Sequence, residues 1–195
     1  MAIAATPTGA EPVDTLSASG SFTGKIRHIK IASAYNTAIF YGDFVKLVAA
    51  GTVEKAAVTT SVAAGTVGIF VGCAYTDPST NQMTFNQQFP ASTAAADIVA
   101  YVVDDPKLLF RMQGDEAIAQ TGLGNNISAV NTAGSTSIGR SKNALDGGSI
   151  ATTNTLPLRV VDFVDGPTSA VGDAFTDCIV TYLPLSHAYE TKLGV

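Results

Sequence analysis

The chain has 195 residues and a net charge of −5, from eleven Lys and Arg residues against sixteen Asp and Glu residues. Hydrophobic residues make up 46% of it and charged residues only 14%, against about 25% charged in a typical globular protein. This composition allows a domain with a sizeable core, and it argues against nucleic-acid binding, which needs clustered Lys and Arg to neutralise phosphates. Because soluble monomers usually carry more surface charge, we expect a partner to cover part of the uncharged surface.

Residues 1–24 form a segment of distinct composition, rich in Ala, Thr, Pro, Gly and Ser and without periodicity. This composition predicts an extended N-terminal arm that is ordered only where it lies on a neighbouring molecule. The arm has neither the basic start nor the apolar stretch of a secretory signal, and no run in the chain is long and apolar enough to suggest a membrane span. Residues 25–195 are predicted to form a single β-rich domain.

Short β-branched and aromatic runs begin this domain. Residues 26–33 and 37–49 are predicted strands, and Gly42-Asp43 interrupts the second one. A turn after residue 49 leads into a return strand over 53–58. The first run contains the only local basic group of the chain, which we interpret as the polar rim of a strand: Lys25, Arg27, His28 and Lys30.

The next predicted strand is the most apolar of the chain. Residues 65–75 are a nearly continuous apolar run between glycines, which is typical of a strand buried on both faces. A turn-rich loop then leads to residues 83–89, where Phe89 falls in phase with Met83 and Phe85. The alternation predicts a further short strand, which the following proline ends.

A turn separates two further strands within residues 96–116. The turn is Asp104-Asp105-Pro106, where the residue before proline is driven out of the helical region and a bend is favoured. Residues 117–130 start with helix-favouring alanines, but Gly122 and Gly124 limit any helix there to two turns at most.

The last third of the chain combines a long polar stretch with two strands. Residues 131–155 have little apolar content and are predicted to be a loop that is functional or lies against something else. Strands are predicted over 156–164 and 176–185, followed by a polar tail. The strong runs are short and separated by turns, which predicts an all-β, mainly antiparallel fold. We expect a β-barrel or a β-sandwich, with a jelly-roll-like arrangement as one alternative. Long loops and at most one or two short helices should complete the fold.

Four aspartates lie close together near the C-terminus, at Asp162, Asp165, Asp173 and Asp177. Asp165 and Asp173 adjoin glycines at breaks in the pattern and suit loop anchors, while Asp177 precedes an apolar run. Asp162 lies inside a strand, on the face of the valines two residues away. The spacing lacks the regular pattern of a calcium loop, and catalysis would require two carboxylates that converge on a pocket. We therefore interpret the four as punctuation of a β-hairpin, with a metal cage or an acidic active site as the alternatives.

The Asp104–Asp105 pair and the two histidines are the other candidate sites. The aspartate pair suits a turn, and in the alternative interpretation it is exposed and meets a basic patch on another subunit. His28 lies in a strand and His187 in the polar tail, and neither has a His, Cys or carboxylate neighbour at metal-ligand spacing. The sequence therefore predicts no metal site.

Cys73 and Cys178 lie in apolar runs far apart in the sequence, without a CxxC motif. We interpret them as buried reduced thiols, with a disulfide between two strands as the alternative. The chain has no G-x-S-x-G elbow, no GxxxxGK loop and no complete dinucleotide-binding glycine motif. The sequence thus predicts no catalytic residue and no cofactor, and we do not expect the protein to be an enzyme.

Four stretches carry a resemblance to a known family: "IASAYNTAIFYGDFVKLVAAGTVEKA", "GIFVGCAYTDPS", "AYVVDDPKLLFRMQ" and "TLPLRVVDFVDGPTSAVGDAFTDCIVTY". They resemble the capsid decoration, or cement, proteins of tailed bacteriophages, over about residues 25–185. The resemblance implies a β-rich virion protein on the outer surface of an icosahedral head. It would clamp neighbouring major capsid protein subunits, commonly as a homotrimer at local threefold positions, after synthesis in the host cytoplasm. It supplies no catalytic residues, and no interface residue is identified from the sequence.

Two other functions are compatible with a β-rich chain of this size. The first is a carbohydrate-binding or adhesion module of a phage tail or fibre, which would present aromatic platforms with polar neighbours. The chain has no Trp, six Tyr and nine Phe, and most of these lie in apolar strand runs, which disfavours this alternative. Binding of the isolated protein to a glycan array would separate the two. The second is a major capsid subunit, which usually needs a longer chain with a substantial helix.

Overall fold

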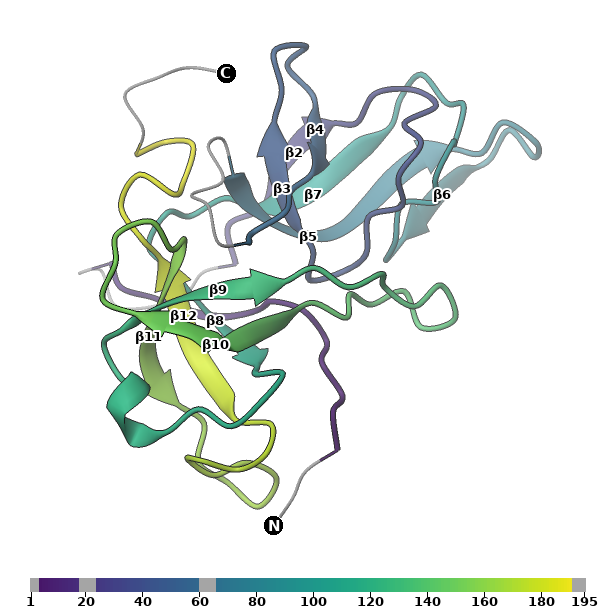
Figure 1. The fold of residues 1–195 in the computed structure, drawn as a ribbon. Helices are drawn as coiled ribbons and strands as arrows, with labels where there is room; N and C mark the ends of the chain where they lie inside the picture. Colours follow the sequence, from purple (N-terminus) through teal and green to yellow (C-terminus); the bar gives the residue numbers. More distant parts are fainter. Residues whose placement is uncertain (1–3, 18–23, 60–65, 191–195) are drawn as a thin grey trace.

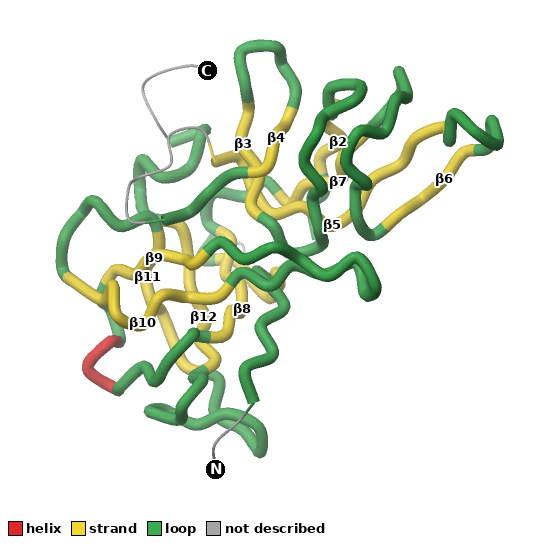
Figure 2. Tube along the Cα trace, turned by 45° about the vertical axis from the view of Figure 1, so that its right-hand side comes forward, coloured by secondary structure: helices red, strands yellow, loops and turns green. Residues whose placement is uncertain are grey.

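The chain forms two antiparallel β-sheets that pack in a sandwich-like arrangement, as the computed structural model shows (Figure 1). The structure describes residues 4–17, 24–59 and 66–190. The predicted all-β, mainly antiparallel fold is confirmed, as a sandwich rather than a closed barrel, since both sheets have open edges. Within these ranges the helical content is a single 3₁₀ turn at Gln120–Gly122, the red segment in Figure 2, and no helix there could span a membrane.

Sheet A contains six strands, β1 from the N-terminal part and five from the second half of the chain. Their spatial order is β1 (Glu11–Thr15), β8 (Leu108–Gln113), β12 (Asp177–Tyr182), β11 (Leu158–Phe163), β9 (Asn126–Val130) and β10 (Ala144–Ala151). Sheet B is built mainly from the first half of the chain. Its order is β2 (Arg27–Lys30), β7 (Val99–Val103), β5 (Thr66–Thr76), β3 (Phe44–Leu47) and β4 (Val53–Lys55), with β6 (Met83–Asn86) also paired to β5.

Strand β5 is the long central strand of sheet B, and it is buried on both faces as its apolar run predicts. Strand β7 pairs with one edge of β5, while β3 and then β6 pair with successive halves of the other edge. Ile69 faces the core shared with sheet A, whereas Phe70 faces a second core that includes Ile39 and Phe89 from loops. Both faces are therefore covered over most of the strand, which explains why it lacks polar alternation.

The core between the sheets centres on three aromatic rings. Phe110 of β8 lies with its ring centroid 5.7 Å from that of Phe44 in β3 and 5.2 Å from that of Tyr182 in β12. Phe44 and Phe110 are fully buried. The cluster also holds aliphatic side chains from both sheets, so sheet A and sheet B share one core.

The Asp104-Asp105-Pro106 turn is present as predicted, but the two strands that it joins belong to different sheets. Strand β7 pairs within sheet B and β8 within sheet A, so the turn is the crossover between the two layers. The Asp105 carboxylate accepts a hydrogen bond from the Lys107 backbone N–H at 2.8 Å, which is typical of an Asp-initiated turn.

The predicted N-terminal arm needs a correction, because part of it belongs to the domain. Glu11–Thr15 form β1, which pairs with β8 of the same chain at the edge of sheet A. Ala10 is fully buried, and its N–H donates to the Gly42 carbonyl at 2.9 Å. The expectation that residues 1–24 are ordered only on a neighbour is therefore wrong for this stretch. Residues 1–3 and 18–23 lie outside the described residues.

The polar stretch 131–155 also departs from the prediction of a single long loop. Ala144–Ala151 form β10, which pairs with β9 over Val130 to Ser128 and resumes at Asn126 after an irregularity. Leu145 is fully buried in the shared core and anchors the strand. Gly147 and Gly148 lie inside this strand. The sequence does not predict a strand here because glycine is uncommon inside regular strands.

Candidate interaction surface

An apolar hollow lies between β1 of sheet A and strands β5 and β7 of sheet B. We call it the N-terminal hollow, and it is lined by Pro12, Gly24, Ile26, Tyr41, Val71 and Val103. Ile26 is 47% exposed at its margin, and Val13 and Leu16 are exposed nearby. Strand β1 borders the hollow as an edge strand, and no strand pairs with its outer side within the described residues. Exposed apolar side chains beside an open strand edge are typical of a protein-binding surface.

A second apolar surface lies at the far end of sheet B. We call it the β6 face. Met83 is 60% exposed and Phe85 72% exposed on β6. They line a shallow hollow together with His28, Ala74, Asp97, Val99 and Tyr101. The surface is open because sheet A covers the opposite end of sheet B, where Phe44 and Ile69 lie. Phe89, which the sequence places in phase with Phe85, is instead fully buried, because β6 ends at Asn86.

Arg27, His28 and Lys30 of the predicted basic group lie on β2, an edge strand of sheet B, as expected for a polar rim, and Lys25 precedes this strand. Arg27 pairs with Asp104 at 2.6 Å, and its guanidinium lies 5.2 Å from the centre of the Tyr189 ring. The Tyr189 hydroxyl donates to the same carboxylate at 3.1 Å. Asp104 is therefore buried and paired within its own chain. The alternative in which Asp104 and Asp105 form an exposed pair for another subunit is wrong for Asp104.

The four C-terminal aspartates punctuate the β11–β12 hairpin. Asp165 and Asp173 lie in its connecting loop, and Asp177 begins β12 and pairs with Arg111 at 2.7 Å. Asp162 is exposed, because an irregularity in register after Val160 turns it away from the core side. Within the described residues, the four do not form a group of converging carboxylates. The hairpin interpretation thus fits where each of them lies.

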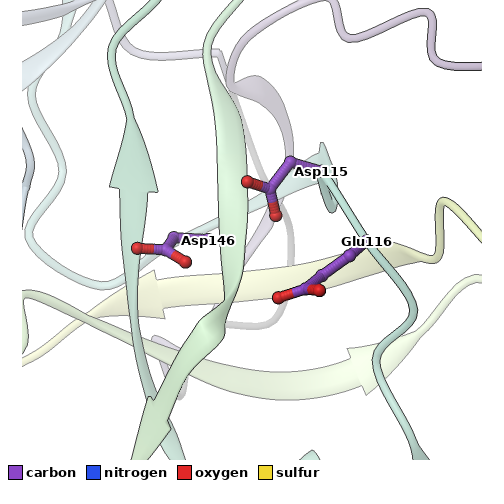
Figure 3. A group of neighbouring side chains, drawn as sticks. All are labelled: Asp115, Glu116 and Asp146. Carbon is purple, nitrogen blue, oxygen red and sulfur yellow. The ribbon is translucent and has the colours of Figure 1, made fainter.

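Three other carboxylates do come together, at Asp115, Glu116 and Asp146 (Figure 3). Their oxygens lie within 4.8 Å of one another, and Asp115 accepts a hydrogen bond from the Gly147 N–H at 3.0 Å. Asp115 and Glu116 follow β8, whereas Asp146 lies on β10, so only the unforeseen pairing of β10 brings them together. The first two are exposed, and exposed acidic groups are common without a metal ion. The three carboxylates lie close enough to share a cation. Nothing else in the described residues points to a bound ion at this place.

The two cysteines are free and buried, Cys73 in sheet B and Cys178 in sheet A. Burial raises the pKa of each thiol to about 12, and the neighbouring Asp177 adds to the effect at Cys178. The structure thus has two unreactive core thiols and not the alternative disulfide.

His187 is fully buried, although its sequence context predicts a polar tail. Its ring lies between those of Tyr182 and Tyr189, at centroid distances of 5.2 Å and 5.1 Å. Its Nδ1 accepts the Tyr189 N–H at 3.3 Å. Burial lowers the pKa of His187, an effect that the Val67 backbone and then the nearby carboxylates of Glu190, Asp104 and Asp105 oppose. Burial within the fold therefore favours the neutral form of the imidazole.

We predict that the free energy of unfolding decreases as the pH falls below about 6.5, the ordinary pKa of an unfolded histidine. Between this value and the lowered pKa of folded His187, the unfolded chain binds the extra proton and is favoured, by up to about 1.4 kcal/mol per pH unit. Urea unfolding between pH 5 and 8 should show a weaker pH dependence for His187→Gln than for the wild type. Identical slopes in the two proteins would contradict the prediction.

Comparison of the chain with protein families, with curated proteins and with solved structures finds no match. The fold alone defines the class of the protein, an antiparallel β-sandwich with open strand edges and two exposed apolar surfaces. Its resemblance to phage decoration proteins stays a prediction.

Proposed function

We propose that the protein is a capsid decoration, or cement, protein, which binds the outer surface of an icosahedral phage head and stabilises contacts between major capsid protein subunits. The N-terminal hollow is the observation that carries this proposal. It combines exposed apolar side chains with the unpaired edge of β1, on a scaffold of two packed sheets. The chain acts through contact area in this role, and catalysis is not part of it.

The geometry suits such a partner in two respects. Pro12 and the register shift after it interrupt the edge of β1, so it offers only some backbone hydrogen bonds to an extended segment of a capsid subunit, and the apolar positions beside it supply most of the contact. The lining of the hollow contains no charged side chain, so little desolvation of the lining itself opposes binding. Repeated over many equivalent positions of a shell, as a trimer at local threefold axes, a modest contact gains strength through multivalency.

The proposal is tested with capsids of the parent phage assembled without this protein. The isolated protein should cosediment with them and raise their melting temperature. Ile26→Lys places a charge in the N-terminal hollow and should weaken binding at least roughly tenfold, because a buried isoleucine contributes about 1.5–3 kcal/mol. A point substitution is preferable to removal of residues 1–24, which would also delete β1.

The matched control is Leu123→Lys, which changes a similarly exposed apolar residue, 44% exposed, beside the 3₁₀ turn. This variant should bind capsids as the wild type does. Wild-type protein that leaves the capsids unbound would refute the proposed function. Equal binding by the wild type and Ile26→Lys would refute the role of the N-terminal hollow.

A further inference from the structure

Strand β6 is an edge strand with no partner on its outer side within the described residues. It pairs only with β5, from Met83 opposite Thr76 to Asn86 opposite Cys73. The chain after β6 is held elsewhere, since Phe89 exchanges two backbone hydrogen bonds with Ile39. Figures 1 and 2 both show β6 at the outer margin of sheet B, away from sheet A. Its outer N–H and C=O groups are therefore free to pair with another strand.

Strand β6 is short, with four residues, but it lacks three other common protections of an edge strand. Natural proteins block exposed edges with charges, prolines or bulges. The stretch 81–89, "NQMTFNQQF", contains no charged residue and no proline, in a chain whose net charge is −5. The pairing of β6 with β5 is regular throughout. A second copy of a chain with this net charge would be repelled at most surfaces, but this strand adds no like charge to oppose it.

The side chains of β6 are self-complementary. When two copies pair antiparallel about a twofold axis at Thr84, Met83 of each copy lies directly opposite Phe85 of the other. Opposed residues of an antiparallel pair project to the same side of the sheet, so each exposed phenyl ring meets a thioether. Methionine sulfur contacts with aromatic rings are favourable, and a twofold contact makes the pair twice.

We propose that β6 is a homotypic pairing site, which joins two copies of this chain across a twofold axis at Thr84 into one continuous sheet. This contact goes beyond the proposed function, because it needs no capsid. It uses the β6 face and leaves the N-terminal hollow open. Twofold pairing predicts that the isolated protein forms particles with an even number of copies, either dimers or pairs of trimers.

The first experiment measures particle mass by light scattering coupled to size exclusion, on the full chain. Phe85→Lys places a charge in the contact and should halve the mass of the wild-type particle. Leu123→Lys, beside the 3₁₀ turn between β8 and β9, should leave the mass unchanged. A wild-type particle with an odd number of copies, or one whose mass Phe85→Lys does not change, would overturn the proposal.

The second experiment tests the register by cross-linking under oxidising conditions. Thr84→Cys should form a disulfide between copies, because directly opposed residues have Cα atoms about 4.5–5.5 Å apart, within disulfide range. Met83→Cys alone should not, since its two copies lie more than about 8 Å apart in this register. A mixture of Met83→Cys and Phe85→Cys should cross-link.

The native thiols are buried and do not compete in this assay. Absence of the Thr84→Cys disulfide, or equally fast cross-linking of Met83→Cys alone, would overturn the twofold register. Capsid binding by the Phe85→Lys variant is a separate measurement. Loss of pairing and loss of the proposed function are therefore distinguishable.

Discussion

Replacement of Asp43 by alanine is expected to lower the free energy of unfolding by about 3–5 kcal/mol, the usual cost of breaking a buried ion pair from one side. Asp43 is fully buried, and its Oδ2 lies 2.8 Å from Lys55 Nζ and accepts the Phe40 N–H at 2.9 Å. Its Oδ1 accepts the Ser141 hydroxyl at 2.6 Å and the Asn143 amide at 3.1 Å. All of these donors lose their acceptor in the alanine variant.

The position of these donors explains why the expected loss is large. Lys55 lies on β4 and the side chains of Ser141 and Asn143 on the loop before β10, so Asp43 joins sheet B to the chain that leads into sheet A. Lys55 is only partly exposed and would keep a charge without its carboxylate partner. The loop before β10 should then exchange its amide hydrogens faster than in the wild type.

Urea unfolding followed by circular dichroism measures the effect on stability. Asp43→Asn keeps the shape and should lose less than Asp43→Ala, because the amide oxygen still accepts some of the hydrogen bonds. Asp162→Ala is the matched control, since Asp162 is an exposed strand carboxylate and its removal should change stability by less than about 0.5 kcal/mol. A loss below about 1 kcal/mol for Asp43→Ala would show that the buried network contributes little.

The sequence predicts strands with strong local patterns and misses those defined by pairing. The run 65–75 is apolar enough to identify β5 without knowledge of its neighbours. Strand β1 contains a proline and no apolar alternation, and it exists because β8 offers it an edge. Strand β10 contains Gly147 and Gly148 and depends on β9 in the same way. These two strands form because they pair with other strands of the sheet. Local β-propensity does not contain information about such partners.

The candidate surfaces were harder to predict than the strands. Met83, Phe85 and Phe89 share one alternation pattern, yet the first two are exposed and the third is buried. Met83 and Phe85 lie on the exposed β6, whereas Phe89 follows the end of this strand and packs in the second core, paired with Ile39. The alternation pattern of a single strand does not contain this partner. His187 shows the same limit, because a tail that is polar in sequence folds back beside the start of β5.

The aromatic cluster between the sheets gives the second large expected effect. Phe110→Ala should lower the free energy of unfolding by about 3–5 kcal/mol, because the substitution opens a cavity in a closely packed core. Phe110 is fully buried and contacts the rings of Phe44 in sheet B and Tyr182 in sheet A, so the cavity lies where the two sheets meet. Loss of these ring contacts adds to the cost of the cavity.

The comparison with Phe85→Ala makes this prediction specific, because the chemical change is identical and only the position differs. Phe85 is 72% exposed, so its removal should change the free energy of unfolding by less than about 0.5 kcal/mol when protein is dilute enough to prevent pairing of copies. Chemical denaturation of both variants at one concentration measures the difference. Similar losses for the two would mean that the core between sheet A and sheet B is not what holds the sandwich together.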